Sequence, residues 1–432
     1  MQRNIVVCSD GTTNAFGYGD TNVATLLRAL NVSEPSRQLV FYEQGIGSNP
    51  KRIDKVKEYK SGLGADGLAL IILPPPVEKF PAPLTRLAGQ LVGYGLKENL
   101  KEMYRALCTE ASARDRVYLF GFSRGAFAVR ALAGLIHHCN LLKNDSVSAK
   151  DNFDRLFDEA FLLFKEHYTD PDNQQKTRAF KKRNTECSIA FLGIWDTVKS
   201  YGGICPVTLP HLRHNPSVER ICHAIAMDEH RTWYKDTTWG WLDSDGKNAR
   251  FIADDPRYST QEIKEVWFPG YHTDVGGGGP GTWPFRWLFG EACEPSLGLL
   301  LNKYGRALLD TEVPLPNLSY NPRDSEHFLW RLSSLVPRFE LDNEHRMSDG
   351  SASKRWRWGA TGKRDMNSAR RREFVCIHSS VGVSDVHNED WGFRPERGWT
   401  ASSRRSDHAV RASLWAVAVL ALGLSLRAHM RR

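Results

Sequence analysis

Residues 117–136 constrain the fold more than any other part of this chain. They begin with an apolar run typical of a buried strand and end with the apolar pattern of a helix packed against a core. The turn Gly121-Phe122-Ser123-Arg124-Gly125 joins the two without a linker. A strand that turns directly into a helix is the building unit of a parallel sheet covered by helices.

The rest of the chain repeats this alternation. Short β-branched or aromatic runs, typical of strands, occupy residues 4–8, 38–42, 116–120, 188–194 and 264–268. Apolar residues at helical spacing predict amphipathic helices over residues 95–109 and 151–168. We therefore predict an α/β protein with an α/β-hydrolase-like, mostly parallel sheet and helices on both faces.

Composition divides the chain into a main domain and a tail. We predict an α/β domain over residues 1–341, interrupted by a long lid-like insert at about 45–96. Residues 342–408 are rich in Arg, Ser, Gly and Asp and predict a loosely ordered basic extension, with one late core strand at about 373–377. Residues 409–432 predict an apolar C-terminal helix.

The apolar run in that helix, residues 412–426, is shorter than the roughly 20 residues that span a bilayer. We expect the helix either to contact a membrane surface or to dock on the body of the protein. The 58 basic and 50 acidic residues leave a net charge of +8, which suits an anionic surface. The basic residues are scattered and accompany no recognised motif, so we expect no nucleic-acid partner.

The eight cysteines lie far apart, without a Cys-x-x-Cys pair or a tight cluster. This spacing indicates buried free thiols and a reducing compartment, rather than disulfides or a zinc site. The N-terminal apolar run is too short for the core of a signal peptide. We expect a cytoplasmic protein that needs no cofactor and no metal.

Ser123 lies where an α/β-hydrolase places its nucleophile. A serine in such a turn has a strained backbone, and small residues two positions away on either side, here Gly121 and Gly125, avoid clashes. The following helix would aim the Arg124 amide at a developing oxyanion. The bare five-residue pattern is common, but its place between a strand and a helix predicts catalysis.

A serine nucleophile needs a histidine base and a carboxylate that orients the histidine. Asp196, directly after the strand at 188–194, is the best candidate acid. Two histidines follow strands at suitable places, and we favour His272, in a Pro-Gly and Gly-rich loop, over His378. Asp274 is an alternative acid or a neighbour that orients the ring.

The first strand runs into Ser9-Asp10-Gly11-Thr12. The amide of Gly11 or Thr12 is a candidate second oxyanion donor. The alternative is a turn in which Asp10 caps its own backbone. Asp10 together with Asp274 could also ligate a cation, although the sequence has no dense carboxylate loop there.

At these residues the chain resembles an α/β-hydrolase family long catalogued as a domain of unknown function, which includes the first class of type VI secretion phospholipase effectors. The resemblance spans roughly residues 4–382. It rests on Ser9-Asp10-Gly11-Thr12, Gly121 to Ala126, Trp195-Asp196-Thr197-Val198, His223 to Arg231, Pro269 to Gly277 and Ile377 to Val381. It implies an esterase-like triad of Ser123, Asp196 and His272, with residues 223–231 forming a structural helix near the site.

We therefore expect a serine ester hydrolase that forms an acyl-enzyme and acts on phospholipid or another lipid ester. Residues 68–73, residues 283–289 and the C-terminal helix are the apolar segments that could approach a lipid surface. One alternative is a catalytically silent, membrane-associated scaffold of the same fold. Another is a soluble hydrolase of small or glycan esters. Acyl length and oligomeric state stay open.

Overall fold

The computed structural model describes residues 2–11, 21–45, 50–74, 95–143, 150–166, 171–198, 209–212, 214–229, 237–239, 255–277, 282–311, 338–346, 352–357 and 376–377. An eight-stranded sheet organises them, in the order β10-β7-β6-β5-β4-β1-β2-β3. Every pairing between neighbours in this sheet is parallel. The predicted α/β class with a mostly parallel sheet is confirmed.

The strands are short, and those at the centre of the sheet are buried along their whole length. Their bounds are β1 Asn4–Ser9, β2 Gln38–Glu43, β3 Leu70–Ile72, β4 Arg116–Phe122, β5 Ile189–Trp195, β6 Val218–Ala226, β7 Glu262–Phe268 and β10 Cys376–Ile377. Every residue of β1, β2 and β5 is buried, as expected for a parallel sheet covered on both faces.

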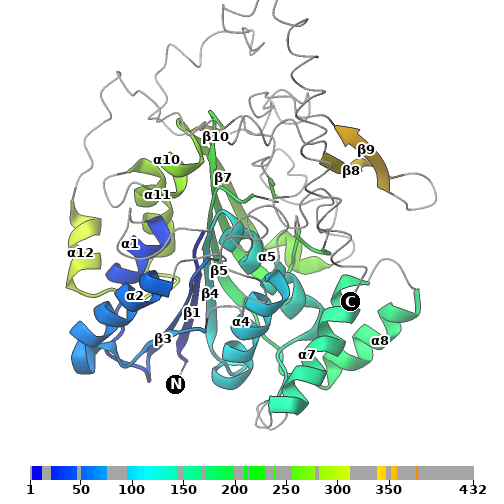
Figure 1. The fold of residues 1–432 in the computed structure, drawn as a ribbon, viewed down its shortest axis with the longest axis horizontal. Helices are drawn as coiled ribbons and strands as arrows, with labels where there is room; N and C mark the ends of the chain where they lie inside the picture. The colour runs from blue at the N-terminus through cyan, green and yellow to red at the C-terminus, as the bar shows by residue number, and fades with distance from the viewer. Residues whose placement is uncertain are drawn as a thin grey trace, which may run out of the picture.

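Helices cover both faces of the sheet, as predicted (Figure 1). On one side lie α1 (Asn22–Ala29), α11 (Trp283–Ala292) and α12 (Lys303–Asp310). On the other lie α4 (Leu96–Glu110), α5 (Arg124–Cys139), α7 (Lys150–Lys165) and α8 (Pro171–Lys182). The other helical elements are α2 (Pro50–Gly62) and the short η1 (Gly64–Gly67), η3 (Pro256–Ser259) and α10 (His272–Gly276).

Helix α5 is the most deeply buried helix of the described chain. It packs against β4, α4, α7 and α8, and almost all of its side chains are buried. Because it begins directly after β4, it carries the Ser123 turn into the centre of the molecule. The six cysteines whose side chains the structure describes are free, and five of them are buried, as the sequence predicted.

The insert predicted at 45–96 is not lid-like in its first part. Residues 50–62 form α2, and Leu70–Ile72 form β3, which extends the sheet beside β2. The side chains of Ala69 and Leu70 are buried in the core. Strand β3 has only three residues, too few to show strand periodicity within the apolar run at 68–73. Residues 75–94 lie outside the described residues.

Two further differences concern strands. Residues 218–226 form β6, whereas the resemblance implied a helix over 223–231. The residues from His223 to Ala226 are buried and pair with neighbouring strands, which holds them in extended backbone. In the basic extension, β8 (Arg338–Arg346) and β9 (Ala352–Arg357) pair as a separate antiparallel hairpin. The expected late strand is present as β10, which pairs with β7.

The apolar segments proposed as lipid-facing lie mostly in the core. In α11 the side chains of Phe285, Leu288 and Phe289 are buried, and in the segment 68–73 only Leu68 is strongly exposed. The C-terminal segment 409–432 lies outside the described residues. Among the residues that the structure describes, no helix is both long and apolar enough to cross a bilayer.

Candidate active site

Ser123 occupies the sharp turn between β4 and α5. Its backbone has φ 58° and ψ −121°, a conformation that L-residues rarely adopt. The turn is held because the Ser123 amide donates to the Trp195 carbonyl over 3.1 Å and the Ser123 carbonyl accepts from the Phe127 amide over 3.2 Å. The predicted strained serine turn is therefore present, with the side chain at the carboxyl end of the sheet.

The two flanking glycines are required by close backbone contacts. A Cβ on Gly121 would lie 2.7 Å from the Cα of Ala126. A Cβ on Gly125 would lie 2.2 Å from the Ser9 carbonyl oxygen and 2.5 Å from that of Asp10. The first turn of α5 thus packs directly against the end of β1, which brings the Asp10 turn next to Ser123.

Three side chains that are distant in the sequence form one hydrogen-bonded chain. The Nε2 atom of His272 lies 2.8 Å from the Ser123 hydroxyl, and its Nδ1 atom lies 2.6 Å from Oδ2 of Asp196. An ionised carboxylate can only accept, so Nδ1 carries the proton and the Nε2 lone pair faces the serine. All three residues are buried, with Ser123 only 7% exposed. The geometry is that of a nucleophile, a base and an acid that orients the base.

Asp196 is fixed by the neighbouring strand β6. Its Oδ1 atom accepts from the Ala226 amide over 2.9 Å, and its own amide donates to the Ala224 carbonyl over 2.7 Å. Its φ of 40° is in the left-handed region, which is uncommon for a residue with a side chain. These contacts turn the carboxylate out of the end of β5 toward His272.

The histidine is the first residue of the short helix α10, rather than part of an irregular loop as expected. Its ring stacks on Phe122, with centroids 4.7 Å apart and the planes 30° from parallel. Its amide donates to Glu229 over 3.3 Å, and the Gly270 amide donates to Asp228 over 2.6 Å. The two acidic residues after β6 therefore hold the turn that presents His272.

The alternative acid, Asp274, makes a different contact. Oδ2 of Asp274 accepts from the Tyr271 amide over 2.9 Å, which caps the start of α10. His378 lies outside the described residues. The structure thus brings Ser123, Asp196 and His272 together and gives Asp274 a capping contact.

Asp10 is a buried anchor for the first loop. Its carboxylate accepts from the Gly11 amide over 2.7 Å and from the hydroxyls of Thr21 and Tyr42, each over 2.9 Å. This arrangement matches the alternative in which Asp10 caps its own turn. Thr12 lies outside the described residues. In the described part of the chain, the side chains grouped as possible metal ligands are three histidines remote from Asp10 and Asp274.

A buried pair beside the candidate acid was not anticipated from the sequence. Nδ1 of His223 lies 2.8 Å from Oε1 of Glu265, and Nε2 of His223 accepts from the Thr197 amide over 3.3 Å. The same Glu265 oxygen accepts from the Trp239 amide over 2.6 Å. The pair thus holds the backbone directly after Asp196. The two residues meet because β6 lies beside β7 with His223 opposite Glu265, a register that no local run of the sequence encodes.

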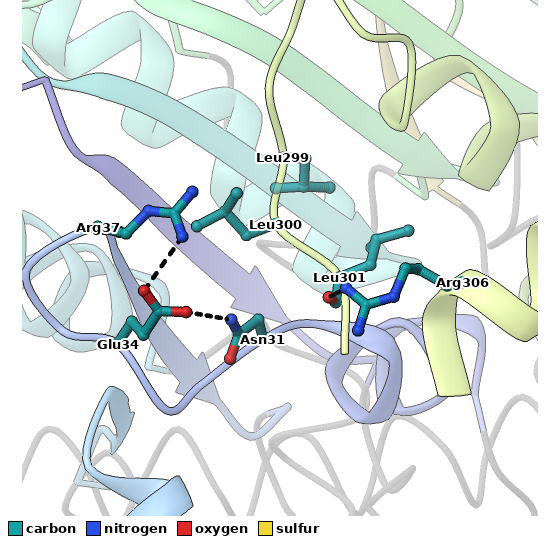
Figure 2. Close-up of a pocket in the computed structure, with 7 residues that line it drawn as sticks. All are labelled: Asn31, Glu34, Arg37, Leu299, Leu300, Leu301 and Arg306. Carbon is teal, nitrogen blue, oxygen red and sulfur yellow. Dashed lines mark hydrogen bonds and ion pairs between the residues drawn. The ribbon is translucent and has the colours of Figure 1, made fainter. Parts of the chain in front are cut away.

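A separate hollow lies at the other end of the sheet (Figure 2). It is lined by residues that precede β2, by residues that precede α12 and by one residue of α12. Glu34 reaches Asn31 and Arg37 there, beside the leucines at 299–301 and Arg306. These residues lie at the amino ends of the strands, whereas Ser123 follows a carboxyl end. The hollow is therefore distinct from the candidate active site.

The chain is similar to a yeast protein over part of its length. It is 29% identical over 243 residues to the Saccharomyces cerevisiae protein "Uncharacterized protein YEL023C", which covers 54% of this chain and 32% of the yeast protein. The chain therefore spans about a third of the length of that curated relative.

Two solved structures are similar over part of their length. One is an uncharacterized protein from Pseudomonas aeruginosa, with 19% identity, a TM-score of 0.34, and coverage of 72% of this chain and 48% of that one. The other is the Tle1 effector bound to the VgrG spike of the type VI secretion system, with 17% identity, a TM-score of 0.27, and coverage of 66% and 52%.

The family comparison covers the whole of the described active site. The family described as "T6SS, Phospholipase effector Tle1-like, catalytic domain" matches residues 3–291, about two thirds of the chain. The matched range contains Ser123, Asp196 and His272, together with β1 to β7. The resemblance seen in the sequence motifs is thereby confirmed, and the chain belongs to the family of Tle1-like phospholipase effector catalytic domains.

Proposed function

We propose that this protein is a serine hydrolase that cleaves phospholipid or another lipid ester through Ser123, His272 and Asp196. The observation that carries the proposal is the continuous pair of hydrogen bonds, 2.8 Å and 2.6 Å long, that joins the three side chains. The family match to a phospholipase catalytic domain supports the lipid ester as substrate class.

In the first half of the reaction, the Ser123 oxygen attacks the ester carbonyl carbon while His272 Nε2 takes the hydroxyl proton. The buried Asp196 carboxylate stabilises the resulting imidazolium. The tetrahedral intermediate then collapses, the bond to the alcohol breaks, and His272 gives its proton to the departing oxygen. An acyl group remains on Ser123, and the alcohol product is neutral.

In the second half, water attacks the acyl carbon and passes a proton to His272. The bond to Ser123 breaks, the serine recovers its proton from the ring, and a free fatty acid leaves. The same three side chains therefore act in both steps, with the roles of base and acid exchanged.

The negative oxygen of each intermediate requires amide donors. Arg124 is the first residue of α5, at the end of the helix where backbone amides point along the axis and favour a negative charge. We assign the first donor to its amide. The second would come from Gly11 or Thr12, because the close contact of Gly125 with Ser9 and Asp10 brings that turn beside Ser123. Donation by Gly11 would require its amide to leave the Asp10 carboxylate.

For the setting of the reaction, we propose a cytoplasmic protein whose C-terminal segment, residues 409–432, contacts a membrane surface. Its apolar run is followed by arginines, and the chain carries a net charge of +8, which favours anionic lipid. Since residues 68–73 and 283–289 are mostly core, this segment is the remaining candidate for lipid contact.

The proposal is tested by labelling the purified full-length protein with a fluorophosphonate probe and assaying it on p-nitrophenyl esters and phospholipid vesicles. Ser123→Ala should abolish labelling and lower kcat by about 10⁴- to 10⁶-fold. The matched control is Ser188→Ala, which removes an exposed hydroxyl bonded to Glu219 at the other end of β5 and should leave both readouts unchanged.

Each alternative has its own outcome in this experiment. Full esterase activity in Ser123→Ala would overturn the nucleophile. An intact protein that neither labels nor hydrolyses any ester would identify a scaffold. Hydrolysis of short p-nitrophenyl esters without release of fatty acid from vesicles would identify a hydrolase of small or glycan esters.

A further inference from the structure

Three histidine side chains meet at the end of α5 that is remote from Ser123. His137 and His138 lie in the last turn of α5, and His211 lies in the segment that leads to β6. One potential ligand atom from each of the three lies within 4.8 Å of the other two. His137 lies 14 positions after Ser123, which places this cluster about 20 Å from the triad along the helix.

The hydrogen bonds of two of these rings determine which nitrogen can bind a ligand. Nδ1 of His138 lies 3.0 Å from the Gly134 carbonyl, and Nδ1 of His211 lies 3.1 Å from the His214 carbonyl. A carbonyl can only accept, so each Nδ1 carries the proton and each Nε2 presents a lone pair in the neutral ring. Metal-binding histidines are commonly oriented in this way: one ring nitrogen binds the metal, and the other donates its N–H to a group such as a backbone carbonyl.

The third ring is oriented in a comparable way. Nδ1 of His137 lies 2.8 Å from the Ser217 hydroxyl. Its ring centroid lies 5.4 Å from that of His138 and 4.5 Å from that of His211. The three imidazole rings therefore lie close enough together for one ion to contact all of them.

The charged groups around the cluster are already engaged. The Lys181 ammonium donates to the His137 carbonyl over 2.6 Å. Arg257 is paired with Asp255, with Nη2 and Oδ2 2.6 Å apart. The Asp255 carboxylate thereby offsets the positive charge of Arg257 near the cluster.

We propose that His137, His138 and His211 bind a divalent transition-metal ion, with Zn²⁺ as the best match, at a structural site. Imidazole nitrogen is a preferred ligand of Zn²⁺, and three histidines leave a fourth position for water. A Zn–N distance of about 2.0–2.1 Å places tetrahedral ligand atoms about 3.4 Å apart. Binding therefore draws the three rings slightly together from their present spacing.

Such an ion would tie the end of α5 to the segment that enters β6. Strand β6 supplies the Ala226 amide that holds Asp196, so the site would brace the scaffold from the opposite end of the sheet. No local spacing indicates this site, because His211 lies 73 positions after His138. The proposal is independent of the proposed esterase activity, and its test uses metal binding as the readout.

The test uses tag-free full-length protein, freed of metal with a chelator and dialysed. Isothermal titration with Zn²⁺ should show one high-affinity site, and saturating Zn²⁺ should raise the melting temperature by at least about 3 °C. His137→Gln and His211→Gln should each weaken Zn²⁺ affinity by about 10- to 100-fold. Glutamine keeps a polar side chain at these half-buried positions.

Two controls separate this site from its neighbours. His214→Gln removes a ring that contacts His211 and bonds Tyr258, and it should bind Zn²⁺ as the wild type does. His272→Ala should also keep full affinity, which excludes Zn²⁺ captured at the triad.

A measurement on the wild type keeps the proposal testable if a variant fails to fold. X-ray absorption of the Zn²⁺-loaded protein should show nitrogen ligands with the imidazole pattern, and Co²⁺ should give the visible spectrum of a tetrahedral site. The proposal fails if the wild type binds no Zn²⁺, if sulfur ligands appear, or if folded His137→Gln and His211→Gln bind Zn²⁺ as tightly as the wild type.

Discussion

The two oxygens of the Asp196 carboxylate have different hydrogen-bond partners. Oδ1 accepts from the Ala226 amide, and Oδ2 faces Nδ1 of His272. The hydrogen bond from Ala226 fixes the direction in which Oδ2 points, because the side chain cannot rotate without losing that bond to β6. At the scale of single residues, the tautomer of His272 is thus set by the main chain of a neighbouring strand.

The first prediction concerns this carboxylate. Asp196→Asn should leave the fold intact, because the amide oxygen can still accept from Ala226, but its NH₂ group would face Nδ1 and favour the wrong tautomer of His272. We expect kcat on an ester substrate to fall by about 10⁴-fold with little change in KM.

The matched control is Asp274→Asn, which alters the carboxylate that caps α10. It should lower kcat by less than about tenfold. Asp274 would be the acid if the two variants showed the opposite order, and steady-state kinetics on both proteins decides the matter.

At the scale of elements, the site depends on how closely α5 approaches β1. Gly125 lies against the main-chain carbonyls of Ser9 and Asp10, and those atoms cannot move aside as a flexible side chain would. The approach brings three loops together at the carboxyl ends of β1, β4 and β5, which is where parallel α/β sheets hold their ligands.

The second prediction tests this packing. Gly125→Ala should destabilise the protein by about 1–3 kcal/mol and slow fluorophosphonate labelling, because α5 and the Ser123 turn must shift away from β1. Gly290→Ala is the control, since a Cβ there meets nothing within 4 Å in helix α11. That variant should be neutral or up to about 1 kcal/mol more stable. Equal melting temperatures for the two variants would contradict the close contact.

At the scale of the whole molecule, the sheet buries a carboxyl group beside the site. Glu43, at the end of β2, is only 1% exposed and accepts from the Ser9 hydroxyl over 2.5 Å. Burial, with a smaller contribution from the charge of Asp10, raises the pKa of Glu43 from 4.5 to about 8. The folded protein therefore holds a proton on this group that the unfolded chain releases above pH 4.5.

The direction in which stability changes with pH follows from that proton. The stabilising contribution of Glu43 is complete below about pH 4.5 and is lost as the pH rises toward about 8. Glu43→Gln cannot ionise, so its free energy of unfolding relative to the wild type should rise between pH 5 and 8, by up to about 1.4 kcal/mol per pH unit.

Urea unfolding of both proteins across this pH range measures the difference. Glu34→Gln, which changes an exposed carboxylate paired with Arg37, should leave the slope between pH 5 and 8 unchanged. A wild-type and Glu43→Gln difference that is independent of pH would show that Glu43 ionises normally in the folded protein.

The sequence by itself determined the α/β class, most of the central strands and the order in which Ser123, Asp196 and His272 follow their strands. Local physics suffices there, since a buried parallel strand leaves a continuous apolar run and a serine turn needs small neighbours such as Gly121 and Gly125. Resemblance to a known family then agreed with the choice of triad.

Only the tertiary structure decided the rest. The resemblance implied a helix over residues 223–231, whereas residues 218–226 form strand β6, which pairs with β5 and β7 in the centre of the sheet. The contacts of Asp228 and Glu229 with the His272 turn, the His223–Glu265 pair and the histidine cluster join residues far apart in the chain. Such contacts depend on which strands become neighbours, a property of the whole sheet that no local run of residues contains.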